Sequence, residues 1–171
     1  NCFTHPIVLI GRLISFTEQF LRRKLCLKFG EKLCGAILWI IVVGTSYFLT
    51  KFVIFLSYRV NPWVGFLVSV WLLYTTLAIR SLYDEAMNIF YALRKNDLRK
   101  ARKLVSGIVG RDTENLSKVD VSRATVETVA ENTIDGIVSP MIYFFIGGVP
   151  LAMAYKAVNT LDSMVGYKDD R

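Results

Sequence analysis

Three long runs without a charged side chain constrain the fold of this chain more than any other feature. They cover residues 33–50, 60–79 and 136–155, and are 18, 20 and 20 residues long. A helix needs about 20 apolar residues to cross the hydrocarbon core of a bilayer. Helices of soluble proteins carry a polar face, and the first two runs carry none. The runs therefore predict an all-α, polytopic membrane protein with two or three transmembrane helices.

The basic residues between these runs predict how the spans are oriented. Residues 1–32 carry six Lys or Arg, the link 51–62 carries two, and residues 80–135 carry ten. Basic segments stay on the cytoplasmic side, so residues 80–135 are expected in the cytoplasm and the spans in the plasma membrane. Anionic lipid headgroups of the bilayer account for the net charge of +7, and no nucleic acid partner is expected.

A single membrane domain over residues 1–171 accommodates all these segments. Its expected parts are an interfacial helix, two transmembrane helices, cytoplasmic helices, a broken element and a motif-bearing helix: 1–32, 33–58, 60–79, 80–135, 136–155 and 156–171. A plain cytoplasmic amphipathic helix is the alternative for the first part. The chain starts with Asn1 instead of Met and ends in a charged run, so it is expected to be a fragment.

Pro140, Gly147–Gly148 and Pro150 interrupt the third uncharged run. A proline in a helix interior costs about 3 kcal/mol. Broken helices at membrane depth occur mainly where they face protein or a wet cavity. Residues 136–155 are therefore expected to form either a kinked transmembrane helix or a re-entrant element.

Four charged residues follow one another at intervals of four: Arg123, Glu127, Glu131 and Asp135. In an α-helix a step of four residues drifts by only about 40° around the axis, so these side chains share one stripe. Like charges at this spacing destabilise a helix, so Arg123, a bound cation or a cationic substrate must offset them. Carboxylate oxygens suit Mg²⁺, which makes Glu127, Glu131 and Asp135 candidate metal ligands. An ordinary solvated helix face is the alternative.

Other polar residues near the stripe or on the last helix complete the candidate site. Arg111 can bind a phosphate or carboxylate through two parallel hydrogen bonds, while Thr113 can donate to a phosphate or cap a helix. Motifs typical of soluble ATPases, dinucleotide-binding proteins and hydrolases are absent from the sequence. The remaining candidates are Asp112, Asn132, Asn159, Asp162 and His5.

Several blocks of the sequence match one known family in order. Residues 5–11 read HPIVLIG, residues 110–113 read GRDT, residues 123–136 read RATVETVAENTIDG, and residues 157–166 read AVNTLDSMVG. In these blocks the chain resembles the adenosylcobinamide-phosphate synthase family of cobalamin biosynthesis over nearly its whole length. Asp84 stands where the family pattern has a histidine.

The resemblance implies a multi-pass membrane enzyme, an ATP-dependent acid–amine ligase that uses Mg²⁺. Its substrates would be the corrinoid adenosylcobyric acid and (R)-1-amino-2-propanol or the O-phosphate of that amino alcohol. The product would be adenosylcobinamide or its phosphate. Other late cobalamin-pathway membrane enzymes are possible partners.

Amide formation from a carboxylate requires activation, and an acyl phosphate is the mechanism that we expect. In this hypothesis the catalytic residues Glu127, Glu131 and Asp135 hold Mg²⁺, with Asp162 as an extra ligand. The substrate- or phosphate-binding residues would be Arg111, Asp112, Thr113, Arg123, Asn132, Asn159 and His5. Two alternatives stay open: a Mg²⁺-dependent membrane transferase acting on a diphosphate substrate, and a non-catalytic membrane subunit of the corrinoid pathway.

Overall fold

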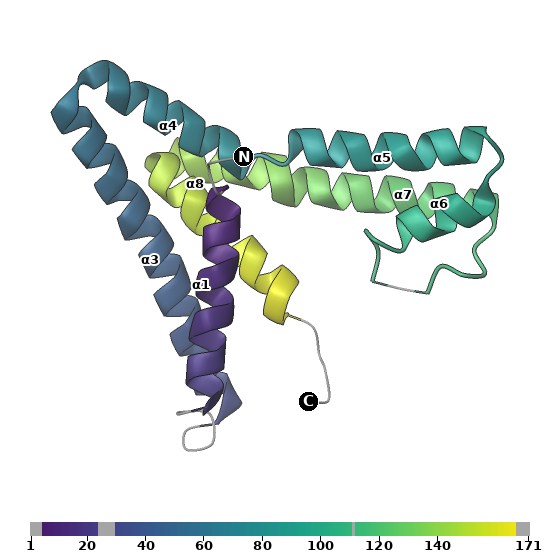
Figure 1. Cartoon of the computed structure of the whole chain (residues 1–171), viewed down its shortest axis with the longest axis horizontal. Helices are drawn as coiled ribbons and strands as arrows, with labels where there is room; N and C mark the ends of the chain where they lie inside the picture. Colours follow the sequence, from purple (N-terminus) through teal and green to yellow (C-terminus); the bar gives the residue numbers. More distant parts are fainter. Residues whose placement is uncertain (1–4, 24–29, 111, 167–171) are drawn as a thin grey trace. The chain divides into compact units, whose positions relative to one another are not determined.

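The computed structural model describes residues 5–23, 30–110 and 112–166, and all its regular elements within these ranges are helices (Figure 1). The all-α prediction is confirmed for this part of the chain. The residues form two compact units. We call Asn1–Leu77 with Ser139–Arg171 the apolar unit, and Ala78–Val138 the polar unit.

Four helices make up the described part of the apolar unit: α1 (Pro6–Leu21), α3 (Glu31–Val60), α4 (Pro62–Thr76) and α8 (Ser139–Val165). Prolines begin α1 and α4, where the missing N–H leaves no hydrogen bond unmade. The preceding residue caps the helix in both cases. His5 Nδ1 accepts a hydrogen bond from Ile7 N at 3.4 Å, and Asn61 Oδ1 accepts one from Trp63 N at 2.8 Å.

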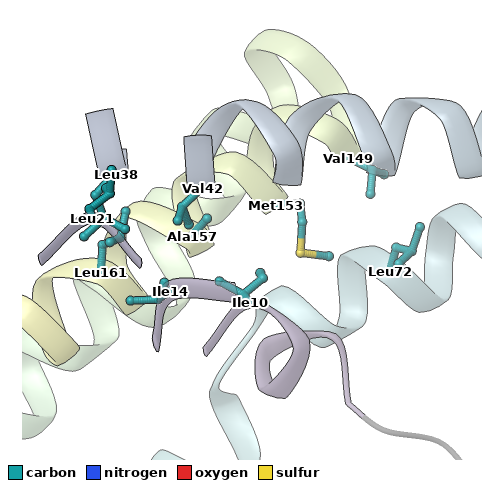
Figure 2. Packing of buried hydrophobic residues seen from close by; sticks show 10 residues of the cluster. All are labelled: Ile10, Ile14, Leu21, Leu38, Val42, Leu72, Val149, Met153, Ala157 and Leu161. Atoms are coloured by element: carbon teal, nitrogen blue, oxygen red, sulfur yellow. The ribbon is translucent and has the colours of Figure 1, made fainter. Parts of the chain in front are cut away.

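The core of the apolar unit is formed by side chains from all four helices (Figure 2). On α3 the buried residues follow at intervals of four, so they form one stripe along the helix: Cys34, Leu38, Val42, Ser46 and Thr50. Large apolar side chains cover much of the remaining surface of α3, and Trp39, Ile40, Phe48 and Phe52 are exposed. Such a surface is suited to lipid.

Three helical stretches are long and apolar enough to cross a membrane: Glu31–Val60, Pro62–Arg94 and Lys118–Val165. They include the three uncharged runs of the sequence, which confirms the prediction of a membrane protein with several spans. Lys51 does not interrupt the first span, because α3 continues past it as one helix of 30 residues with the Lys51 side chain exposed.

The third run is broken at Gly147 and Gly148, inside α8. Gly147 has φ −143° and ψ 19°, and Gly148 has φ 70° and ψ −168°, so neither residue is helical. Only glycine adopts the conformation of Gly148 readily. A Cβ atom on Gly147 would also lie 2.7 Å from Leu151 Cδ2. These two glycines therefore make the break that the sequence predicts.

The described part of the polar unit contains three α-helices and one π-helix: α5 (Ile79–Arg94), α6 (Leu98–Val105), α7 (Lys118–Thr133) and η2 (Ile134–Val138). Small and branched apolar residues form its core: Ile89, Ala92, Ala101, Val105, Val121 and Ala124. Asp97 Oδ1 accepts a hydrogen bond from Lys100 N at 3.0 Å and caps α6. Ser117 and Asp120 form a capping box at the start of α7.

Candidate functional site

Helix α7 presents three of the predicted site residues on its surface. Arg123, Glu127 and Glu131 are exposed and follow at intervals of four, so they share one face of the helix. This face belongs to the polar unit, whose core lies on the side of α7 that carries Val121, Ala124 and Thr128. The predicted stripe is therefore present on α7 as an accessible charged surface.

Asp135, the fourth member of the stripe, lies beyond α7 in the π-helix η2 and is half-buried. A π-helix closes its hydrogen bonds over five residues instead of four. Residues after Thr133 therefore lag behind the register of α7. Single π-turns inside helices are frequent at functional sites, and this one begins two residues after the half-buried Asn132.

Gly136 explains how the π-helix is held in place. Pro140 has no N–H to donate to the carbonyl four residues earlier, that of Gly136. The Gly136 oxygen accepts instead from Ala78 N at 3.0 Å. A Cβ atom on Gly136 would lie 3.1 Å from Ala78 Cβ, so the close approach requires glycine. This bond joins the first residue of the polar unit to its last turn.

The loop before α7 carries the predicted residues Arg111, Asp112 and Thr113. Arg111 lies outside the described residues. Asp112 is exposed, and its Oδ1 accepts from Glu114 N at 2.9 Å. Thr113 is buried and donates from Oγ1 to Arg102 O at 3.2 Å, while Arg102 Nε donates to Leu116 O at 2.7 Å. The Thr113 hydroxyl therefore fastens this loop to α6.

The remaining predicted residues belong to the apolar unit. Asn159 is half-buried on α8, and Asp162 is exposed one turn later. Asp162 O accepts from Gly166 N at 2.8 Å at the end of this helix. His5 is exposed and caps α1 through its ring nitrogen. The structure describes each unit by itself, so the grouping of Asp162 with the α7 stripe stays a prediction.

The donor types of the stripe suit a magnesium ion that is shared with substrate. Mg²⁺ usually takes one or two carboxylates and completes its shell with water and substrate phosphates. Among residues 5–23, 30–110 and 112–166, no three His, Cys, Asp or Glu side chains are gathered closely enough to hold a metal ion. The assignment of Glu127, Glu131, Asp135 and Asp162 as Mg²⁺ ligands stays a prediction.

Sequence reasoning did not single out Lys156 on α8. Its side chain is only 7% exposed, although Lys is almost never buried in proteins without a partner. The signal was visible, because this lone basic residue stands among small and apolar neighbours in Ala152–Ala157. A lone basic residue next to an apolar run is otherwise typical of a charge that flanks a transmembrane helix.

Comparison with known proteins gives a family. A family model described as CobD/Cbib protein matches residues 1–171. The cobalamin biosynthesis protein CbiB of Salmonella typhimurium is 50% identical over 167 residues, which are 98% of this chain and 52% of that protein. The cobalamin biosynthesis proteins CobD of Citrobacter koseri and Klebsiella pneumoniae are 48% and 46% identical over the same shares.

This chain spans about half the length of the curated relatives that it matches. No solved structure matches it significantly. The family model nevertheless covers every residue of the chain, including the α7 stripe and the motif on α8. The chain belongs to the CobD/Cbib protein family.

Proposed function

We propose that the protein acts in cobalamin biosynthesis as an adenosylcobinamide-phosphate synthase. It would attach (R)-1-amino-2-propanol, or the O-phosphate of that amino alcohol, to adenosylcobyric acid through an amide bond. The observation that carries this proposal is the match to the CobD/Cbib family over residues 1–171, with relatives near 50% identity that are named cobalamin biosynthesis proteins.

The proposed reaction is an ATP-dependent ligation. A carboxylate oxygen of adenosylcobyric acid attacks the γ-phosphorus of ATP, which gives an acyl phosphate and releases ADP. The amine then attacks the acyl carbon, inorganic phosphate leaves, and the ammonium proton passes to a base. Positioning and charge stabilisation supply most of the catalysis in phosphoryl transfer. The charged side chains on the exposed face of α7 are suited to both tasks.

The residues of α7 and η2 have distinct parts in this proposal. Glu127 and Glu131 would hold Mg²⁺, which when bound neutralises phosphate charge. Arg123 would bind phosphate oxygens from the same face of α7. Asp135 would accept the proton of the attacking amine, since its half-buried place in η2 lies next to the exposed stripe in the chain. Asn132 would orient the substrate.

We also propose that the polar unit lies on the cytoplasmic side of the plasma membrane, where ATP is available. The ten basic residues of 80–135, against two in 51–62, support this orientation. Labelling of single cysteines placed at exposed positions of α6 by a membrane-impermeant reagent tests it. Protection in intact cells with labelling in broken cells is expected, and labelling in intact cells would contradict it.

Membranes that contain the full-length protein test the reaction. Adenosylcobyric acid, aminopropanol phosphate and Mg-ATP are added, and the condensed corrinoid is detected by mass spectrometry. Glu131→Gln should reduce the rate at least about tenfold, because even groups that only support a metal ligand usually contribute that much. Glu114→Gln is the matched control, since Glu114 is an exposed carboxylate outside the stripe.

The outcomes separate the proposed ligase from its alternatives. Product with the wild type and loss of product only in Glu131→Gln would support the ligase and the stripe together. Product that persists at the full rate in Glu131→Gln would remove the stripe from catalysis. No corrinoid product, together with turnover of a polyprenyl diphosphate, would instead favour a diphosphate transferase.

A further inference from the structure

Lys156 places most of a cationic side chain inside the helix packing of the apolar unit. Its side chain is 7% exposed. It follows Val149 by seven residues, which is nearly two helical turns, and therefore lies on the same side of α8. Val149 and Met153 on that side pack in the core with residues of α1, α3 and α4 (Figure 2). The aliphatic part of the Lys156 side chain therefore lies on the side of α8 that the other helices cover.

No described carboxylate of the apolar unit neutralises this charge. The unit has three of them between residues 5 and 166: Glu18, Glu31 and Asp162. Glu18 Oε1 accepts from Arg22 Nε at 2.9 Å, and Glu31 is exposed in the first turn of α3. Asp162 follows Lys156 by six residues, about 120° around α8, and is exposed.

The ammonium group of Lys156 also has no hydrogen bond or ion pair to any described residue of its unit. No buried side-chain nitrogen or oxygen atom of the described residues lacks a hydrogen-bond partner, so the ammonium nitrogen reaches the surface of the unit although most of the side chain is buried. Ionisable side chains inside membrane proteins are costly, and they mark sites for substrates or ions by default. The position of Lys156 therefore favours binding of an anion that comes from outside the apolar unit.

Neighbouring polar groups on α8 complete a suitable surface for such an anion. Asn159 and Thr160, three and four residues after Lys156, are half-buried on the same side of the helix. The Thr160 hydroxyl donates to Lys156 O at 2.8 Å and so is already used. The Asn159 amide offers two N–H donors about one helical turn from Lys156 on α8.

We propose that Lys156 and Asn159 form a binding site for an oxyanion, a carboxylate or a phosphate monoester, in the apolar unit. Lys is a common phosphate ligand because it offers a compact charge. This inference deepens the proposed function and rests on it only for the source of the anion, since adenosylcobyric acid carries a carboxylate and aminopropanol phosphate carries a phosphate monoester. A phospholipid headgroup has the same chemistry and is the other source.

Binding to the full-length protein in phosphatidylcholine nanodiscs tests the site without any turnover. Inorganic phosphate and aminopropanol phosphate are titrated by calorimetry. Lys156→Gln should weaken binding of at least one probe by about tenfold or more, the usual worth of a charge-assisted hydrogen bond. Lys51→Gln, which changes an exposed lysine of α3, should leave the affinity unchanged. Equal affinities in wild type and Lys156→Gln would overturn the proposal.

Thermal unfolding without any added anion gives an independent readout. Lys156→Met should leave the unfolding midpoint unchanged or raise it, because no described group of the unit pairs with the charge that it removes and methionine has a side chain of similar length. A lowered midpoint would show that Lys156 pairs with a carboxylate of the protein, which would overturn the proposal. Lys156→Arg, which keeps the charge, is the control for folding.

Two further comparisons identify the source of the anion and separate this inference from the proposed function. Wild-type protein that loses phosphate affinity in phosphatidylglycerol nanodiscs, while Lys156→Gln does not change, would identify a lipid headgroup at the site. Unchanged wild-type affinity would identify a soluble ligand. Phosphate binding that depends on Lys156, without any condensed corrinoid in the turnover assay, would support this site and contradict the proposed reaction.

Discussion

Replacing Gly136 with alanine should loosen the junction between α5 and η2 in the polar unit. The new Cβ atom would lie 3.1 Å from Ala78 Cβ, which is closer than an ordinary carbon–carbon contact. The two backbones must separate by several tenths of an ångström to relieve it. The hydrogen bond from Ala78 N to Gly136 O, now 3.0 Å long, would then reach the limit of useful geometry.

The size of the effect follows from three terms. Overpacking costs about 1–3 kcal/mol, and weakening one hydrogen bond adds about 0.5–1.5 kcal/mol. Alanine regains up to about 1 kcal/mol, because glycine is the poorer helix former. The free energy of unfolding should therefore fall by roughly 2 kcal/mol, the balance of these terms.

Hydrogen exchange followed by mass spectrometry measures this change at the junction itself. Peptides that contain the Ala78 amide should exchange faster in Gly136→Ala, by about tenfold or more for an opening that is easier by 1.4 kcal/mol or more. Gly44→Ala is the matched control, since a Cβ atom on Gly44 meets nothing within 4 Å. Unchanged exchange at Ala78 in Gly136→Ala would refute the argument from close approach.

Two other substitutions test local features of the fold. Asp97→Ala removes the cap of α6 and should lower the unfolding free energy by about 1 kcal/mol; Asp84→Ala, which breaks only the exposed pair with Arg80, should have a smaller effect in the same denaturation series. Gly148→Ala forces a side chain onto a φ of 70° and should lower the unfolding midpoint, at a cost of about 1 kcal/mol or more. A midpoint equal to that of wild type would show that the break in α8 can relax without glycine.

The spans could be predicted from the sequence because their signal is local. A helix that crosses a bilayer needs about 20 consecutive apolar residues. Runs such as 60–79 meet this requirement and can be recognised directly in the sequence. The break in α8 was likewise visible in Gly147–Gly148. Lys51 was less easy to interpret, because a charge within an apolar stretch can either end a helix or extend into solvent from an uninterrupted one, as it does here.

The candidate site could be predicted only in part, since its geometry depends on contacts that are distant in sequence. An α-helical period carried on to residue 135 places Asp135 in one stripe with Glu131. The π-helix, stabilised by a bond from Ala78 to Gly136 across nearly sixty residues, changes that register. The burial of Lys156 likewise depends on the helices that cover α8, and its small and apolar neighbours in sequence are only an indirect sign of it.

The division of the chain into units has a consequence for biosynthesis. Helices α1, α3 and α4 leave the ribosome before the polar unit, and α8 leaves only after it. At about 5–20 residues per second, the 61 residues of the polar unit take roughly 3–12 s to make. During that time Leu38 and Val42 of α3 lack their partners Ala157 and Leu161. Until α8 has been synthesised, α1, α3 and α4 therefore form an incomplete bundle. A chaperone or the insertion machinery must cover the side chains that later pack against α8.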